Sequence, residues 1–446
     1  MKLADYTQEV AEHHAQPSVQ AEVDGLEEQR EQLRALLYEV IPSERIVQLS
    51  SLERSRARAE LAALVEQLIN EHGVAVSTMD EHARIIDETL DMVLGLGPLE
   101  GMLEDPTITE IMVNGPGSVF IERDGVILPR AERFASEEQL RLVVDRIVSP
   151  LGRRIDEQQP IVNARLPQGH RVNAVIPPIA FKGTAVTIRK FRETSFTLDE
   201  LVANGTLTAP MAQLLVWSIR LRENIAVSGG TGGGKTTLLN ALSREIPDEE
   251  RIVTIEDSSE LRFDHHPHVV QLEARMANAE GKGRVTIREL VINALRMRPD
   301  RIIVGECRGA EALDMLQAML TGHDGSLTTL HANSPAEVVQ RLVMMVRYGI
   351  DLPTQVIEAQ IASALDMVVQ QDRTRGGKRR ITQICAREVR GADGTRIEQG
   401  MFTPCVVWDR RSSTYEWRGV PRWVDELASM GLATHEEVRS WLHELR

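Results

Sequence analysis

Apolar residues in the first part of the chain recur at helical spacing among charged ones. Residues three and four positions apart lie on one face of a helix. Between residues 24 and 95, Pro42 separates two such runs, whose apolar positions are Leu33, Leu36, Leu37 and Val40, then Leu61, Leu64, Val65 and Leu68. The pattern predicts a small bundle of amphipathic helices, which serves either to dock onto a partner or only as a packed appendage.

From about residue 105 the hydrophobic period shortens to that of strands. The runs ITEIMVNG and SVFIER flank a turn at 114–117, and ARLPQGHRVNAVI and TAVTIRKF follow later. Short β-rich runs bounded by Gly, Pro and Asn favour strands. Between them, Ser136 and Gln139 form a capping box that predicts a helix through Ile147. A mixed α/β domain is therefore expected here.

Beyond residue 225 strand-like and helix-like segments alternate. The β-rich runs IAVS, RIVTIE, RIIVGE, SLTTLHA and DMVVQQ are separated by periodic helical stretches. This alternation predicts a largely parallel sheet covered by helices on both faces. Two glycines at 376–377 then separate DMVVQQ from RRITQICAREV, which indicates a closing antiparallel hairpin.

Length, charge and cysteine content narrow the classes of protein. The 446 residues suffice for two or three cores, and the three cysteines (307, 385 and 405) lack the spacing of a metal site or a disulfide framework, which fits a reducing compartment. The net charge is −15, and residues 1–100 hold 8 Lys and Arg against 20 Asp and Glu, a net charge of −12. Nucleic acid is not an expected partner of this end, because phosphate binding depends on Lys and Arg. We also expect neither an export signal nor a transmembrane helix.

The strongest motif is GGTGGGKT at Gly229–Thr236, which fits the phosphate-binding pattern G-x-x-x-x-G-K-[ST] between an expected strand and an expected helix. Glycines let successive N–H groups converge on phosphate oxygens, and the following helix adds the positive end of its dipole. We expect Lys235 to reach the β- and γ-phosphates, Thr236 to place its hydroxyl on Mg²⁺, and Thr237 to contact another phosphate. The expected nucleotide-binding residues are Gly229, Gly230, Thr231, Gly232, Gly233, Gly234, Lys235, Thr236 and Thr237.

Acidic residues follow two of the expected strands. Hydrolysis requires a carboxylate that holds the metal and a group that orients or deprotonates water. Glu306 ends the run RIIVGE and is expected to contact Mg²⁺ directly or through water, while EDSSE at 256–260 follows IVTI. Ligands bind beyond the carboxyl ends of strands in such sheets. One of the three acids in EDSSE is therefore expected to be the general base.

Two histidines, His323 and His331, flank SLTTL. A zinc site is not indicated, because no third ligand has suitable spacing. Each histidine is either a sensor of the γ-phosphate or a hydrogen-bonding residue of the core.

These motifs resemble those of the secretion ATPases of the type II/type IV superfamily, and within it the CpaF-like (Tad or Flp pilus) branch. The resemblance rests on GGTGGGKTT, TIEDSSEL and VGECRGAEALDMLQAMLTGHDGSLTTLHANS, and it covers about residues 95–390. Lys235 and Thr236 match the Walker A pair, and Glu306 with Arg308 matches the Walker B segment. The resemblance therefore implies that Arg308 contacts nucleotide and that Thr236 and Glu306 hold the metal.

The remaining motifs of this family are matched as follows. The run 256–260 resembles the Asp box, whose final acid, Glu260, is implied as catalytic base with Glu256 and Asp257 supporting it. His323 and His331 resemble the His box. In such proteins the preceding domain supplies arginines to the nucleotide, often across a subunit boundary. The segments RVNAVIPP and TIRKF resemble those regions and imply Arg171 and Arg189, with Arg165 third.

The chain departs from the family pattern at four positions. Ser258 replaces the usual Pro of the Asp box, and Gly233 replaces the usual Ser of the phosphate-binding loop. Asn163 stands where Asp is common, and Cys307 where an apolar residue is more typical. None of these changes removes a reacting group.

The resemblance implies a RecA-like P-loop ATPase domain preceded by a smaller mixed α/β (PAS-like) domain and an N-terminal helical bundle. The expected segments are an acidic helical region (1–95), an α/β domain (96–195), a linker (196–208), the ATPase domain (209–400) and a C-terminal extension (401–446). Nucleotide is expected between the two α/β domains.

The implied function is Mg²⁺-dependent ATP hydrolysis by a cytoplasmic homo-oligomer, a hexamer, on the inner face of the cell membrane. It would act through platform proteins to power pilus assembly, pilus retraction or secretion. One alternative is a RecA-like nucleic-acid translocase or helicase, although the acidity and the 4% aromatic content argue against it. Another is a nucleotide-binding scaffold that barely hydrolyses ATP.

Overall fold

The computed structural model divides the chain into two compact units, Met1–Phe191 and Arg192–Arg446. The residues that it describes are 54–72, 95–123, 125–134, 136–191, 196–263, 265–278, 280–374, 377–391, 394–397 and 400–445. The first predicted helical run lies outside the described residues. The second forms α4 (Arg54–His72), in which Val65 and Leu68 are buried. Among the helices in these ranges, none is long and apolar enough to cross a bilayer.

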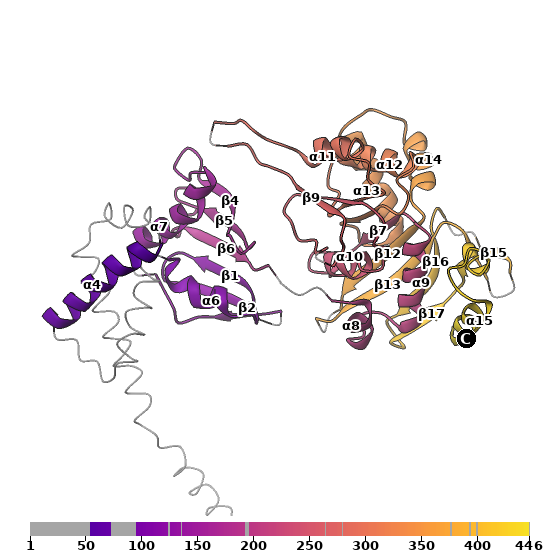
Figure 1. Ribbon diagram of the computed structural model, residues 1–446, viewed down its shortest axis with the longest axis horizontal. Coiled ribbons are helices and arrows are strands. Elements are labelled where there is room, and N and C mark those ends of the chain that lie inside the picture. The colour runs from indigo at the N-terminus through magenta and orange to yellow at the C-terminus, as the bar shows by residue number, and fades with distance from the viewer. Residues whose placement is uncertain are drawn as a thin grey trace, which may run out of the picture. The chain divides into compact units, whose positions relative to one another are not determined.

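The N-terminal unit contains a six-stranded antiparallel sheet in the order β3-β2-β1-β6-β5-β4 (Figure 1). Its strands are β1 (Ile108–Asn114), β2 (Val119–Arg123), β3 (Val126–Pro129), β4 (Ile161–Arg165), β5 (Arg171–Val175) and β6 (Ala185–Arg189). The predicted helix forms as α7 (Glu137–Val148), because the Ser136 hydroxyl accepts a hydrogen bond from the Gln139 N–H at 3.2 Å.

One face of this sheet packs against α7 and forms the core of the unit. The strands alternate, so that Ile111, Val172 and Val186 point into that core while their neighbours lie on the opposite face. The shorter helices are η1 (Gly97–Leu99), α6 (Glu100–Glu104) and η2 (Ser149–Leu151). The sheet thus has one covered face and one polar face.

The C-terminal unit is built on a nine-stranded sheet in the order β17-β16-β13-β12-β7-β11-β10-β8-β9. Six neighbouring strands, from β12 to β9, are parallel, and the remaining three pair antiparallel, so the predicted hairpin of β12 and β13 is confirmed. The strands are β7 (Ile225–Ser228), β8 (Ile252–Glu256), β9 (Val269–Glu273), β10 (Arg301–Val304), β11 (Leu327–Leu330), β12 (Met367–Arg373), β13 (Arg379–Ala386), β16 (Thr403–Asp409) and β17 (Thr414–Trp417).

Helices cover both faces of this sheet (Figure 1), as the alternating pattern predicts. One face packs against α8 (Leu198–Ala203), α9 (Ala209–Arg220), α10 (Lys235–Ser243) and α15 (His435–Glu444). The other packs against α11 (Ile287–Ala294), α12 (Glu311–Leu320), α13 (Pro335–Arg347) and α14 (Thr354–Ala364). A separate small sheet joins β14 (Val389–Arg390), β15 (Arg396–Ile397) and β18 (Val420–Pro421), and η3 (Arg422–Asp425) follows it.

Two expected segment boundaries differ from those of the structure. The expected linker, 196–208, contains α8, which begins with a capping box between Thr197 and Glu200 and buries Leu198 and Leu201 in the C-terminal unit. The expected extension beyond residue 400 contains β16 and β17, which continue the nine-stranded sheet. Both segments are thus part of the second core, because their apolar residues are buried there.

We expect the half-buried carboxyl group of Glu223, in the C-terminal unit, to make folding stability depend on pH. Burial, with repulsion by Asp366, raises the pKa of Glu223 to about 8, against the opposing charge of Arg387. Folding raises this pKa, so the folded state binds the proton of Glu223 more tightly than the unfolded state does. The free energy of unfolding is therefore highest below the ordinary pKa near 4.5 and falls as pH rises to about 8.

Glu223→Gln should therefore remove part of the loss of stability that the parent shows between about pH 5 and 8.5. At pH 8.5 the variant should be more stable than the parent by on the order of 1–3 kcal/mol. Urea unfolding followed at several pH values measures this effect, with Glu249→Gln, a change at an exposed carboxylate, as the control. Parallel pH profiles of parent and Glu223→Gln would contradict the prediction.

Candidate active site

The phosphate-binding loop connects β7 to α10, as its sequence predicts. Gly229 has φ of +156° and Gly234 has φ of +98°, and a Cβ atom at Gly229 would clash with the main-chain oxygen of Gln371. Lys235 is 8% exposed, and its ammonium donates to the carbonyl oxygens of Gly229 and Gly230 at 3.1 Å each. The loop therefore holds the lysine over its own main chain.

Strands β12 and β13 support the phosphate-binding loop from the side. The Arg379 guanidinium donates to the Gly232 oxygen at 3.1 Å, and the Ser228 hydroxyl donates to the Gln370 side chain at 2.6 Å. Neither Arg379 nor Gln370 was expected at the site from the sequence. Their contacts come from strand pairing across more than 130 residues, so no local pattern could have indicated them.

Two of the acids at the end of β8 have different contacts. Glu256, the last residue of β8, anchors the following loop, and Glu260 contacts the phosphate-binding helix α10. Glu256, 4% exposed, accepts the main-chain N–H of Glu260 at 2.8 Å and of Leu261 at 3.0 Å. Gly305 makes room for it, since a Cβ atom there would lie 2.8 Å from Glu256 Cγ. The Glu260 carboxylate accepts the Thr236 hydroxyl at 3.3 Å. Of the three acids, Glu260 is thus the one placed beside the loop that would hold nucleotide.

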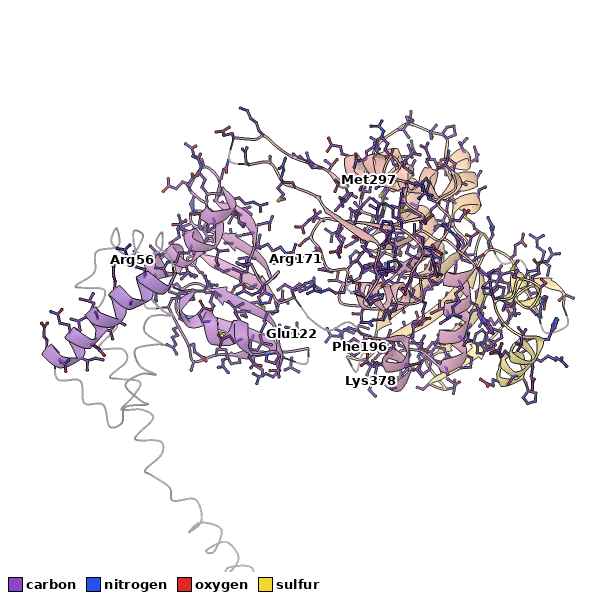
Figure 2. All side chains as sticks on the ribbon, viewed as in Figure 1. Arg56, Glu122, Arg171, Phe196, Met297 and Lys378 are labelled. Carbon is purple, nitrogen blue, oxygen red and sulfur yellow. The ribbon has the colours of Figure 1, made fainter. Side chains whose placement is uncertain are left out.

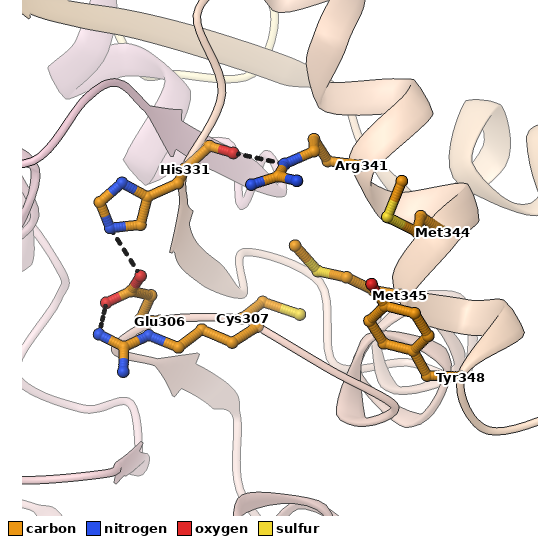
Figure 3. Close-up of a pocket in the computed structure, with 8 residues that line it drawn as sticks. Glu306, Cys307, His331, Arg341, Met344, Met345 and Tyr348 are labelled. Carbon is orange, nitrogen blue, oxygen red and sulfur yellow. Dashed lines mark hydrogen bonds and ion pairs between the residues drawn. The ribbon is translucent and has the colours of Figure 1, made fainter.

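Glu306, which follows β10, contacts the side chains of Arg308 and His331 (Figure 3). Arg308 Nη2 lies 2.7 Å from its Oε2, and His331 Nε2 lies 2.9 Å from its Oε1. Burial opposes ionisation of Glu306, but Arg308, His331 and the charge of Lys235 outweigh it, so the pKa of Glu306 lies below its ordinary value. Arg308 also lies 3.9 Å from Asp257. Glu306 is therefore ionised at neutral pH and close to the phosphate-binding lysine.

The two histidines of the expected His box lie at opposite ends of β11. His331 follows the strand, and burial, with the charges of Lys235 and Arg308, lowers its pKa although Glu306 opposes the shift. A neutral His331 can donate from Nε2 to Glu306. His323 precedes the strand and its Nδ1 lies 3.3 Å from the carbonyl oxygen of Ala318. The structure does not bring His323 to the other site residues, and its half-buried ring contacts the main chain near the end of α12.

A cavity of about 280 Å³ adjoins the Glu306 group. Arg341 of α13 borders it and donates from Nε to the main-chain oxygen of His331 at 3.1 Å (Figure 3). Its lining residues are Glu306, Cys307, Arg308, His331, Arg341, Met344, Met345 and Tyr348. Arg341 was not expected from the sequence, and it fixes the backbone that carries His331.

The three expected arginines form a row across the sheet of the N-terminal unit. Arg165 pairs with Arg171 between β4 and β5, and Arg171, labelled in Figure 2, pairs with Arg189 between β5 and β6. Directly paired residues share a face, and buried Val172 alternates with Arg171, so the row lies on the face opposite α7. Like charges placed opposite one another destabilise a sheet. The row is thus a candidate site for an anion.

The C-terminal unit gathers most of the predicted residues at the carboxyl edge of its parallel strands. Lys235 and Thr236 follow β7, Glu260 follows β8, and Glu306 follows β10. Thr237 lies in the first turn of α10, and Thr231 is exposed at the tip of the loop. The site thus combines main-chain donors of a loop, one lysine and several carboxylates. Such groups bind a nucleoside triphosphate together with a divalent cation and activate water.

The sequence of this chain is similar to those of several known proteins. Residues 93–406 match the family model described as type II/IV secretion system protein. A Mycobacterium tuberculosis protein named for conjugal transfer is 41% identical over 321 residues, which are 70% of this chain and 88% of that protein. The type IV secretion system protein VirB11 of Brucella suis is 36% identical over 301 residues, 61% of this chain and 83% of VirB11. A crystal structure of the Brucella suis VirB11 ATPase with sulphate has 33% identity and a TM-score of 0.36, and the match covers 65% of this chain and 95% of that one.

Proposed function

This chain belongs to the type II/IV secretion system protein family, and we propose that it is a Mg²⁺-dependent ATPase that drives a pilus or secretion machine. The observation that carries the proposal is the position of Lys235, Thr236, Glu260 and Glu306 at the carboxyl ends of neighbouring parallel strands in one sheet. That the family includes the VirB11 ATPase supports ATP as the substrate. A lysine over a glycine loop together with a carboxylate beside it can both bind and hydrolyse a triphosphate.

In the proposed reaction Lys235 exchanges its two carbonyl partners for phosphate oxygens of ATP. Glu260, 3.3 Å from the Thr236 hydroxyl, orients water and accepts its proton. The oxygen donors of Thr236 and Glu306 fit Mg²⁺, which prefers hydroxyl, carboxylate and phosphate oxygens. When bound, Mg²⁺ would neutralise charge on the phosphates. The lowered pKa of Glu306 keeps its carboxylate ionised for this role.

His331 and Arg308 orient Glu306 in this proposal. Each contacts a different oxygen of the carboxylate, at 2.9 Å and 2.7 Å. A change at the phosphates that moves Glu306 is thereby passed to His331, which serves as the sensor of the γ-phosphate. His323 has a structural role, in keeping with its hydrogen bond at the other end of β11.

Within the family, we propose that this chain belongs to the CpaF-like branch, which serves Tad or Flp pili. The motifs GGTGGGKTT, TIEDSSEL and SLTTLHANS support it. In this proposal the chain works as a hexameric ring on the cytoplasmic face of the inner membrane and transmits its motion to platform proteins. The acidic region 1–95 is the proposed docking module for such a partner.

Steady-state hydrolysis by the purified full chain tests the proposed function. Turnover should require Mg²⁺ and stop with EDTA, and nucleotide should favour a ring when oligomer mass is recorded. ATP binding without turnover, even in a ring, would favour a scaffold. Stimulation of turnover by DNA would favour a translocase instead.

The arginine row is proposed to stabilise charge on the phosphates. Arg171→Ala and Arg189→Ala should each lower turnover about tenfold or more, because an arginine at the transferred phosphoryl group can contribute on the order of 10³ to 10⁵ in rate. The same assay with Arg133→Ala, a change at an exposed arginine of the same unit, provides the control. If Arg171→Ala and Arg189→Ala both turn over at the parental rate, these arginines are not part of the active site.

A further inference from the structure

Side chains from neighbouring elements hold the loop that carries Glu260. Glu256 accepts the N–H groups of Glu260 and Leu261, and the Gln271 amide donates to the Leu261 oxygen at 3.2 Å. Glu273 accepts the N–H of Ser259 at 3.2 Å. Main-chain groups that leave a sheet need such partners when they are buried. The position of the Glu260 carboxylate therefore depends on residues outside the loop.

Asn240 of α10 completes this set of contacts. Its Nδ2 donates to the Glu260 carbonyl oxygen at 3.3 Å, and its Oδ1 accepts the N–H of Arg262 at 2.9 Å. The side chain is 7% exposed, so water competes little for either bond. One amide thus bridges the two residues on either side of Leu261 and fixes the backbone of Glu260.

Asn240 lies four residues after Thr236 on the same helix, and residues at that spacing share one helix face. Thr236 contacts the Glu260 carboxylate, whereas Asn240 contacts the Glu260 main chain. We propose that Asn240 is a positioning residue for hydrolysis: it aligns the base with the helix that binds the phosphates. The inference rests on the proposed ATPase function and on Glu260 as its base.

Asn240→Leu removes both hydrogen bonds at similar side-chain volume. We expect kcat to fall about 30- to 100-fold, because a misplacement of about 1 Å can cost on the order of 100-fold in rate. KM and the affinity for a fluorescent ATP analogue should stay within about threefold, since Lys235 and the loop are untouched. Asn240→Asp keeps an acceptor for Arg262 but loses the donor to Glu260, and it should also lower kcat. Asn293→Leu, at an exposed position on α11, is the matched control.

A double variant decides whether Asn240 acts through the base. Single-turnover assays with excess enzyme compare parent, Asn240→Leu, Glu260→Gln and the pair, because groups that act as one unit are not additive. The inference predicts that Asn240→Leu costs little more once Glu260 is glutamine. An equal loss in both backgrounds, a loss of nucleotide affinity, or unchanged kcat in Asn240→Leu would overturn it. If the parent itself shows no turnover, the proposed function fails and this inference fails with it. A hydrolysing parent with normal kcat in Asn240→Leu refutes the inference alone.

Discussion

Replacing Lys235 with alanine should give a folded chain that no longer hydrolyses ATP. The Lys235 ammonium contacts the phosphate-binding loop, at 3.1 Å from two of its carbonyl oxygens. Removing one preorganised electrostatic contact to a reacting group costs about 10²- to 10³-fold in kcat. Here the affinity for nucleotide should fall as well, because the lysine contacts the bound phosphates.

When steady-state ATP hydrolysis is measured for both variants, Glu260→Gln separates nucleotide binding from the chemical step. The amide keeps the size of the side chain but cannot accept a proton, so turnover should fall by about 10² to 10⁴ while nucleotide still binds. Lys282→Ala, at an exposed lysine whose Nζ lies 3.7 Å from a Glu280 oxygen, is the control for the loss of one positive charge in Lys235→Ala. Turnover by Glu260→Gln at the parental rate would assign the base to another residue.

Replacing Glu250 with alanine should lower the free energy of unfolding of the C-terminal unit by about 3–5 kcal/mol. The Arg301 side chain is fully buried, and its guanidinium lies 2.6 Å and 3.0 Å from the two Glu250 oxygens. It also donates to the main-chain oxygens of Ile219 and Gly325. Without Glu250 the buried cation loses its counter-charge, and this is costly in a low-dielectric interior.

Tryptophan fluorescence during urea unfolding measures this loss in one unit. The five tryptophans of the chain are at positions 217, 408, 417, 423 and 441, all within Arg192–Arg446. Glu249→Ala, at the exposed neighbouring acid, should change the unfolding midpoint by little. A change below about 1 kcal/mol for Glu250→Ala would mean that another group neutralises Arg301.

Some features of the site could be predicted because they depend on neighbours in the sequence. The phosphate-binding loop needs glycines at fixed positions between a strand and a helix, and those residues are adjacent in the chain. The helix that begins after Ser136 needs only its cap and its apolar face. The place of Glu306 near the end of a strand could be predicted because only Gly305 separates it from the buried run of β10. In each case the residues that define the feature lie within about fifteen positions, the reach of one helix or strand with its turn.

Other features could not be predicted because distant segments decide them. The pattern of 256–260 by itself left three acids as candidates, and Glu260 was implied only by the family resemblance. The room at Gly305 and the contact with Thr236 distinguish the anchor Glu256 from Glu260 on physical grounds. His323 and His331 look equivalent in sequence, yet β11 places them at opposite edges of the sheet.

The sequence by itself determined the alternation of strands and helices, the loop expected to bind phosphate and the chemical type of each reacting group. The tertiary structure decided which acid reaches the phosphate-binding helix, that three arginines form one row, and that 196–208 and the strands beyond 400 belong to the second unit. The reason is physical. Backbone torsions and hydrophobic period are local properties, whereas strand register and the burial of a charged side chain depend on residues that meet only when the sheet has formed.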